Sequence, residues 1–240
     1  MRPFLSVISK QRTTPEMAAD DSQSLSEDAS ANTRDRIKAV AAELYVLHGH
    51  DGFSFGDVAR AIGTTRANIH HHFGSKRQLM EELIEDFAAN AETRTEGYWT
   101  KGDAGFFERL DLQLDDLRRF YERFNKTSGK RNVWSPLSRL RHDLPDLGVV
   151  AEDALERVNR KYEDILRHAV TAAIRSGELS ADTPTEDLVR ILRVTLLACP
   201  PMTQDKGSFD EISCLFGALA RTISAAWKEP YRPVGETKKP

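Results

Sequence analysis

The sequence predicts an all-α protein, with a small N-terminal helix-turn-helix domain followed by a larger helical body. Three observations lead to this prediction. Apolar residues recur at intervals of three and four through most of the chain, which is the period of a helix with one buried face. No segment of any length alternates apolar and polar residues, as a half-buried strand does. Short stretches containing Ser, Thr or Gly separate the periodic segments and supply residues that begin and end helices.

The composition is that of an ordinary globular chain. Of its 240 residues, 40% are hydrophobic and 30% are charged, so a sizeable buried core can form. No apolar run approaches the roughly 18 residues of a membrane-spanning helix. The apolar patch near Met1 is too short for a signal peptide. We therefore expect a cytoplasmic protein with no membrane association. The two cysteines, Cys199 and Cys214, give neither a disulfide framework nor a zinc-binding pattern.

Residues 1–32 are predicted to be a disordered tail, because they are rich in Ser, Asp, Ala and Thr and contain few apolar residues to bury. Met17 lies inside this segment and is an alternative start of the natural chain. The first firm helix is expected to begin at a cap formed by Asn32 or Thr33. It carries an amphipathic stripe over residues 37–47.

The segment SFGDVARAIGTTRANIHHHFGSK, which begins at Ser54, is typical of two short helices joined by a tight turn. Ser54 is placed to cap the first helix, and Gly63 lies where the chain must bend, since glycine tolerates a positive φ. Thr64 and Thr65 supply a cap for the second helix, and Ser75 opens the next one with a capping box. Two helices joined by such a turn form a helix-turn-helix, whose second helix can enter the DNA major groove.

The second of these helices carries side chains that suit nucleic acid. Arg66 can bind a guanine or a phosphate, and Asn68 and the histidines of residues 70–72 offer hydrogen-bond donors. Ile69 and Phe73 are four residues apart, so we expect both to face inward and hold the helix to its domain.

The charge of the chain is unevenly distributed. The net charge is −3, which by itself does not suggest a DNA-binding protein. Residues 33–80, however, contain seven basic and four acidic side chains, a net charge of +3 that leaves −6 for the remainder. A basic module on an acidic body is expected when only one part of a protein meets phosphate, although a solvated surface of mixed charge is the simpler alternative.

The stretch from Thr33 to Leu83 resembles the N-terminal domain of the TetR/AcrR family of transcriptional regulators. The residues that carry the resemblance are TRDRIKAVAAELYVLHGHDGFSFGDVARAIGTTRANIHHHFGSK, which follow the order of the family without a gap. This chain departs from the family at two positions, with His70 where most members have Tyr and Thr64 where they have an aliphatic residue.

The resemblance implies which side chains meet DNA. The positions that face bases in the family are occupied here by Arg66, Ala67 and His70. The positions that face the DNA backbone are occupied by Ser54, Thr65, Asn68, His72 and Lys76.

Each of these assignments has a simpler alternative. Arg66 can contact a phosphate instead of a base, and Lys76 can be an ordinary exposed lysine. Ala67 can touch a thymine methyl or simply allow close approach. The three consecutive histidines do not predict a metal site, because successive helical residues point about 100° apart and cannot close on one ion. We expect no cofactor.

The DNA-binding domain is predicted to occupy residues 33–80, the helical body residues 81–228, and a flexible tail residues 229–240. A helix opening at Ser75 is expected to lead out of the DNA-binding domain. Within the body, apolar stripes predict helices over residues 106–124 and 150–174, separated by shorter pieces.

Two further helices are predicted at the end of the chain. Thr183 to Glu186 combines a capping box with proline at the first helical position, and Pro200 and Pro201 are expected to end that helix. By the resemblance, helices of about residues 184–199 and 209–227 form a homodimer interface. The residues alone indicate only two apolar helices that need a partner surface, which can lie within the chain.

The resemblance also implies a ligand pocket in the body, for which no residue is assigned. Several aromatic residues suit either an apolar pocket or the core: Trp99, Phe120, Phe124, Trp134, Tyr162 and Trp227. Similarly, Arg139, Arg141 and His142 suit either an anionic ligand or a solvated basic face.

No nucleophile elbow, phosphate-binding glycine loop, HExxH motif or carboxylate pair indicates an enzyme. The resemblance implies a homodimeric repressor that binds a pseudo-palindromic operator in double-stranded DNA and is released by a small-molecule effector. An activator, or a regulator that needs its ligand in order to bind DNA, fits equally well. Two other classes stay open: a helical enzyme with a regulatory N-terminal domain, and a ligand-binding protein that has lost its affinity for DNA.

Overall fold

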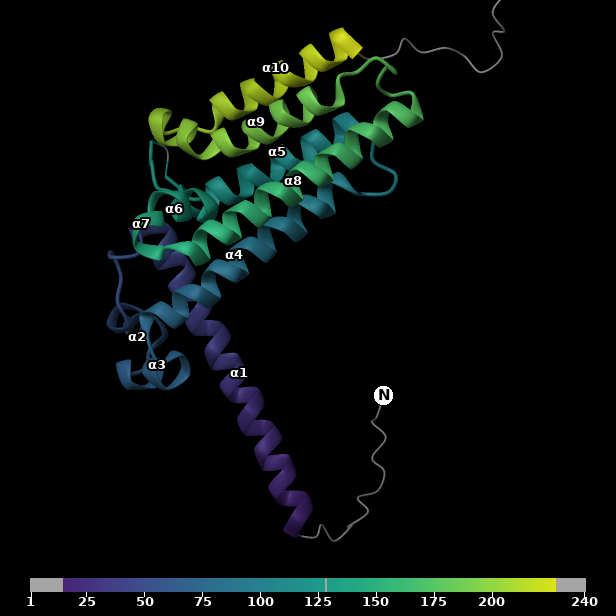
Figure 1. Ribbon diagram of the computed structural model, residues 1–240. Coiled ribbons are helices and arrows are strands. Elements are labelled where there is room, and N and C mark those ends of the chain that lie inside the picture. Colours follow the sequence, from purple (N-terminus) through teal and green to yellow (C-terminus); the bar gives the residue numbers. More distant parts are fainter. Residues whose placement is uncertain (1–14, 128, 228–240) are drawn as a thin grey trace, which may run out of the picture.

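The computed structural model describes residues 15–127 and 129–227, and in the first helix it describes side chains from Asn32 onward. The described residues form ten helices and no β-strand, which confirms the all-α prediction (Figure 1). The helices are α1 (Pro15–His48), α2 (Phe55–Ile62), α3 (Arg66–Phe73), α4 (Lys76–Trp99), α5 (Phe106–Phe124), α6 (Pro136–His142), α7 (Leu144–Leu147), α8 (Val149–Ser176), α9 (Thr185–Lys206) and α10 (Asp210–Trp227).

The C-terminal half of α1 packs with α2 and α3 into a small head, as the three-helix prediction requires. Its core contains Ile37 and Tyr45 of α1, Val58 of α2, and Ile69 and Phe73 of α3, all buried. Ile69 and Phe73 therefore face inward as predicted and hold α3 to the head.

The local signals in the helix-turn-helix are realised, except that the capping box predicted at Ser75 is only half formed, because the Ser75 N–H donates to the Phe73 carbonyl and not to Gln78. Ser54 caps α2 through a complete capping box with Asp57, and the chain turns at Gly63 with φ +72°. Thr65 caps α3 by accepting a hydrogen bond from the Asn68 N–H, and the Ser75 hydroxyl does the same for α4. These bonds join residues only three apart, which explains why they could be predicted from sequence.

The N-terminal region differs from the prediction. The backbone of residues 15–32 continues α1, so the helix has no start at Asn32 or Thr33. The segment contains four alanines and has Pro15 in its first turn, and both features favour a helix at this place. In Figure 1 this part of α1 extends away from the remainder of the molecule. Residues 1–14 and the predicted tail, 229–240, lie outside the described residues.

The body is a layered bundle of long helices. Helix α8 packs between α4 and α9, while α5 and α10 lie alongside each other (Figure 1). Helix α4 crosses the predicted domain boundary after residue 80 without interruption, so head and body share one helix. Trp99, Phe106 and Leu166 are among the large side chains fully buried in the body. None of the described helices is both long and apolar enough to cross a membrane.

The predicted start of α9 is wrong in detail. Pro184, not Thr183, is the residue before the helix, and α9 has no side-chain cap. The Thr183 hydroxyl instead donates to the carbonyl of Ser180, 2.7 Å away, in the preceding turn. A hydroxyl that closes this local turn is no longer available to the helix.

The predicted end of α9 is also wrong, because the helix continues through Pro200 and Pro201 to Lys206. Proline cannot donate to the preceding turn, which normally breaks a helix. Here the helix is held by its surroundings: Pro200 is buried, and the buried Thr203 donates to the Pro200 carbonyl at 2.8 Å. The indole of Trp134 donates to the Thr203 hydroxyl at 2.7 Å and ties this turn to the body.

The turn between α2 and α3 gives a stability prediction. A Cβ at Gly63 would meet nothing within 4 Å, but φ is +72°. We expect Gly63→Ala to lower the free energy of unfolding by about 1 kcal/mol, because a left-handed backbone strains any residue with a Cβ. The matched control is Gly97→Ala, at an open, exposed position inside α4. It should raise stability by about 0.5–1 kcal/mol in the same urea titration. Equal changes in the free energy of unfolding for the two variants would contradict the role of the left-handed backbone at Gly63.

Candidate nucleic-acid interface

Helix α3 presents one solvent-exposed face. Arg66 and His70 lie one turn apart on it, as do Ala67 and His71, and all four are exposed. The structure thus brings the three residues predicted to face bases onto one surface. The same surface includes His71, to which the sequence analysis assigned no DNA contact. Its spacing of four residues from Ala67 already indicated that the two side chains share a face of the helix.

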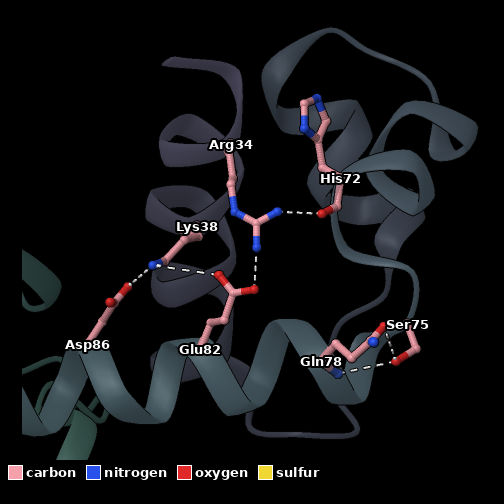
Figure 2. A network of polar contacts seen from close by, with 7 residues as sticks. All are labelled: Arg34, Lys38, His72, Ser75, Gln78, Glu82 and Asp86. Atoms are coloured by element: carbon pink, nitrogen blue, oxygen red, sulfur yellow. Dashed lines mark hydrogen bonds and ion pairs between the residues drawn. The ribbon is translucent and has the colours of Figure 1, made fainter. Parts of the chain in front are cut away.

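A network of polar contacts holds α3 between α1 and α4 (Figure 2). Arg34 of α1 donates to the carbonyl of His72 and pairs with Glu82 of α4. Its guanidinium also lies 4.2 Å from the centre of the Phe73 ring. Lys38, one turn further along α1, pairs with Asp86 of α4 at 2.6 Å. The carbonyls at a helix C-terminus have no partner within the helix and attract cations, so Arg34 stabilises the end of α3.

Two more cations of the head serve backbone carbonyls. Arg36 donates to Ile62 at the end of α2, at 3.4 Å. Lys76 donates to the carbonyl of Phe53 at 2.7 Å and to that of His50, and its ammonium lies 4.5 Å from the centre of the Phe53 ring. Burial lowers the pKa of Lys76 from its ordinary value. Lys76 therefore braces the loop between α1 and α2.

Arg66 differs from the other basic side chains of the head. Six of the seven cations in residues 33–80 bond to a carboxylate or a carbonyl: Arg34, Arg36, Lys38, Arg60, Lys76 and Arg77. Arg66 has no such partner among the described residues. The excess of basic residues is thus mostly committed inside the head, and the uncommitted guanidinium lies on the exposed face of α3.

The ring of His70 is oriented by its surroundings. Its Nδ1 lies 2.9 Å from the carbonyl oxygen of Gly74, and the ring packs edge-on against Phe55 with centroids 4.8 Å apart. A carbonyl oxygen only accepts, so Nδ1 must carry the proton. In the neutral ring, Nε2 is then an acceptor. His70 is exposed, so this acceptor is available to a partner outside the protein.

The residues predicted to face phosphates fall into two groups. Ser54 and Thr65 are exposed at the N-termini of α2 and α3, where their oxygens serve as caps. Asn68, His72 and Lys76 are half-buried. The Asn68 amide donates to Thr64 at 3.0 Å. Burial, followed by the charges of His71 and Arg34, lowers the pKa of His72, which favours its neutral form. Hydrogen bonds from Ser54 lower the pKa of Asp57.

A second feature is a cavity of about 380 Å³ in the body, bounded by α1, α4, α5, α6, α8 and α9. Four of the aromatic residues considered from sequence line it, namely Phe120, Phe124, Trp134 and Tyr162, whereas Trp99 and Trp227 do not. The three basic residues considered for an anionic ligand, Arg139, Arg141 and His142, lie in different environments. Arg141 lines the cavity, and Arg139 donates to the Val46 carbonyl of α1 at 3.1 Å. The exposed ring of His142 contacts the buried carboxylate of Asp143.

Known proteins are similar to this chain both in the head, which contains the helix-turn-helix, and in the helical body. The family described as "Bacterial regulatory proteins, tetR family" matches residues 37–83. The transcriptional repressor KstR2 of Mycolicibacterium smegmatis is 33% identical over 172 residues, which cover 69% of this chain and 76% of KstR2. The repressor AcnR of Corynebacterium efficiens is 33% identical over 94 residues, and the match spans 39% of this chain and only 46% of AcnR. A TetR transcriptional regulator from Chloroflexus aurantiacus shares the fold, with a TM-score of 0.71 and 20% identity over 85% of this chain and 100% of that one.

The network in Figure 2 predicts that α3 depends on Arg34. We expect Arg34→Ala to speed amide hydrogen exchange in α3 by about 5- to 30-fold, or about 1–2 kcal/mol, since its bonds are charge-assisted but partly exposed. Arg60→Ala is the control, because the ion pair of Arg60 within the described part of the chain is with Asp57 of its own helix, α2, at an exposed position. It should change exchange in α3 by less than about 0.5 kcal/mol. Equal exchange rates in the two variants would contradict the role of Arg34.

Proposed function

This chain belongs to the TetR family of bacterial transcriptional regulators, and we propose that it represses transcription by binding a double-stranded DNA operator through α3. The observation that carries the proposal is Arg66: an exposed guanidinium without a partner in the described part of the chain, on the outer face of the second helix of a helix-turn-helix. All other cations of the head already bond within the protein. Such a side chain is free to exchange water for a base edge or a phosphate.

The exposed face of α3 suggests how bases are read. Arg66 is proposed to bind the N7 and O6 acceptors of a guanine. Ala67 approaches a thymine methyl without steric hindrance. The Nε2 acceptor of neutral His70 suits the exocyclic amino group of cytosine or adenine. Each of these contacts belongs to a different base position, so each makes a separate contribution to specificity.

The remaining candidates are proposed to position the head on the DNA backbone. Ser54 and Thr65 lie at helix N-termini, where backbone N–H groups favour a phosphate. Asn68 and His72 lie beside the exposed face of α3 and are also proposed to contact phosphates. Lys76 directs two of its three ammonium protons at carbonyls, which leaves one for a phosphate. Its substitution is expected to disturb the loop before α2 as well as the phosphate contact.

We propose that α9 and α10 form a homodimer interface, centred on residues 184–199 and 209–227. Both helices lie at the outer side of the body (Figure 1). Ile191 and Val194 of α9 are 47% and 56% exposed, although most large apolar side chains that the structure describes are covered. A second copy of the same face would cover them. The two α3 helices would then meet successive major grooves of a pseudo-palindromic operator, about 34–36 Å apart or a multiple of this spacing.

The cavity in the body is proposed to bind a small-molecule effector that releases the operator. Helix α6 connects the cavity with the head: Arg139 donates to Val46 and Leu47 at the end of α1, and the Asp143 carboxylate accepts from the His50 N–H at 2.9 Å. A ligand that moves α6 therefore displaces the end of α1. It can shift the head only by its differential affinity for the two arrangements. Such a regulator acts without catalysis and in the cytoplasm, where its operator lies.

Arg66→Ala tests base reading. With DNA flanking the gene of this protein as probe, we expect specific binding to weaken by about 1–3 kcal/mol and specificity to relax at one base position. Arg60→Ala, which removes an exposed arginine already paired with Asp57, is the matched control and should bind nearly as the unmodified protein does. Gel shifts across salt concentrations, with unrelated DNA as competitor, provide the measurement. A loss that is equal on every sequence would reassign Arg66 to a phosphate.

Val194→Glu tests the interface. A carboxylate placed in a buried apolar contact lacks a partner, so we expect the dimer dissociation constant to rise at least about 100-fold in sedimentation equilibrium. The control is Val149→Glu at the start of α8, where the valine is 63% exposed on a different helix. That variant should dimerise normally. An unchanged dimer in Val194→Glu would remove α9 from the interface.

A further inference from the structure

The cavity of the body is mainly apolar. Aromatic and aliphatic side chains from α4, α5, α8 and α9 and the segment before α6 form most of its wall, including Phe87, Leu117, Phe120, Phe124, Trp134 and Leu196. Its volume of about 380 Å³ is of the size that holds a small organic molecule. A wall of this kind favours an apolar ligand body, because binding removes apolar surface from water.

Three arginines also line this cavity, against one acidic side chain, and two of the three are neutralised. Arg94 pairs with the buried carboxylate of Asp116 and stacks 3.8 Å from the centre of the Phe120 ring. Arg123 pairs with Glu43, which is the acidic residue of the lining. Asp116 also pairs with Arg119, and neither Asp116 nor Glu43 is paired with the third arginine of the lining.

Arg141 is the third arginine, and it has no carboxylate partner among the described residues. Its guanidinium donates to the Leu137 carbonyl of its own helix at 3.2 Å and to the Asn159 side-chain oxygen at 3.5 Å. Both acceptors are uncharged, and the second contact is long. Burial lowers the pKa of Arg141, and the charge of Arg193 lowers it further while Tyr162 opposes the shift. A half-buried cation without a counter-charge is costly, so the site favours an incoming anion.

Arg94 lines the same cavity, and one of its nitrogens is unpaired among the described residues. Its Nε is buried and has no hydrogen-bond partner in the described part of the chain, although its terminal nitrogen bonds to Asp116. A cationic or purely apolar ligand would leave the guanidinium of Arg141 without a counter-charge.

We propose that the effector of this protein is an amphipathic anion, with an apolar body against the aromatic wall and a carboxylate-like head group bound by Arg141. This inference rests on the proposed function, because it names the chemical class of the molecule that enters the regulatory cavity. The planar fork of arginine matches a carboxylate through two parallel hydrogen bonds, which gives the site selectivity for the head group. Arg141 is also on α6, so the anion would act on the helix whose Arg139 holds the end of α1.

The test uses the full-length protein without DNA and three probes of equal chain length: decanoate, decanol and decyltrimethylammonium. Calorimetry measures binding, and the emission of Trp134 in the cavity wall reports occupancy. We expect decanoate to bind at least about tenfold more tightly than decanol and the cation not to bind at concentrations up to about 1 mM. In Arg141→Gln, the affinity for decanoate should fall to that of decanol, while the affinity for decanol is unchanged. Arg141→Lys should retain part of the preference for the anion.

Two further measurements make the result independent of folding and of operator binding. Arg160→Gln removes an exposed arginine of α8 paired with Glu156 and should bind all probes as the unmodified protein does. Removing an uncompensated cation should leave the melting temperature of ligand-free Arg141→Gln unchanged or raised. A lowered melting temperature would assign Arg141 a structural role and overturn the proposal. Equal affinity for decanoate and decanol, or no binding of decanoate, would overturn it too. None of these readouts requires DNA, so failure of the operator experiment is a separate outcome.

Discussion

The backbone carbonyls at the C-terminal ends of the helices in the head accept hydrogen bonds from cationic side chains of other elements. The geometry of the head depends on these contacts. Arg139 bonds to the end of α1, Arg36 to the end of α2 and Arg34 to the end of α3. The last carbonyls of any α-helix have no partner within the helix. A cation at that end satisfies them and opposes the negative end of the helix dipole. The orientation of the exposed face of α3 therefore depends on residues far from it in sequence, such as Arg34.

This use of cations changes how the charge of the head is interpreted. The basic excess of residues 33–80 suggests a surface that attracts phosphate, but most of those side chains bond within the protein. The groups that we propose for DNA binding are therefore few: Arg66, the exposed ring of His70 and the N-termini of α2 and α3. This proposal favours the reading of a defined site over binding to any duplex through charge alone.

Helix α6 gives its arginines two different environments. Arg139 and Arg141 are two residues apart and so point about 200° apart around the helix. The first reaches the carbonyls of α1, and the second lines the cavity. A single turn of helix thereby contacts both the head and the cavity, without any intermediate element. Continuity of α4 through head and body adds a second rigid link between the same two regions.

The sequence by itself determined the features that depend on contacts within about four residues: the caps at Ser54, Thr65 and Ser75, the turn at Gly63, and the exposed face of α3. The fold class followed from the same helical period. Only the tertiary structure decided which arginines are committed, that α9 continues through Pro200 and Pro201, and that Arg141 rather than Arg139 lines a cavity. These outcomes rest on partners tens of residues away, such as Trp134 with Thr203 and Arg139 with Val46. Local periodicity contains no information about such partners, because packing between elements selects them.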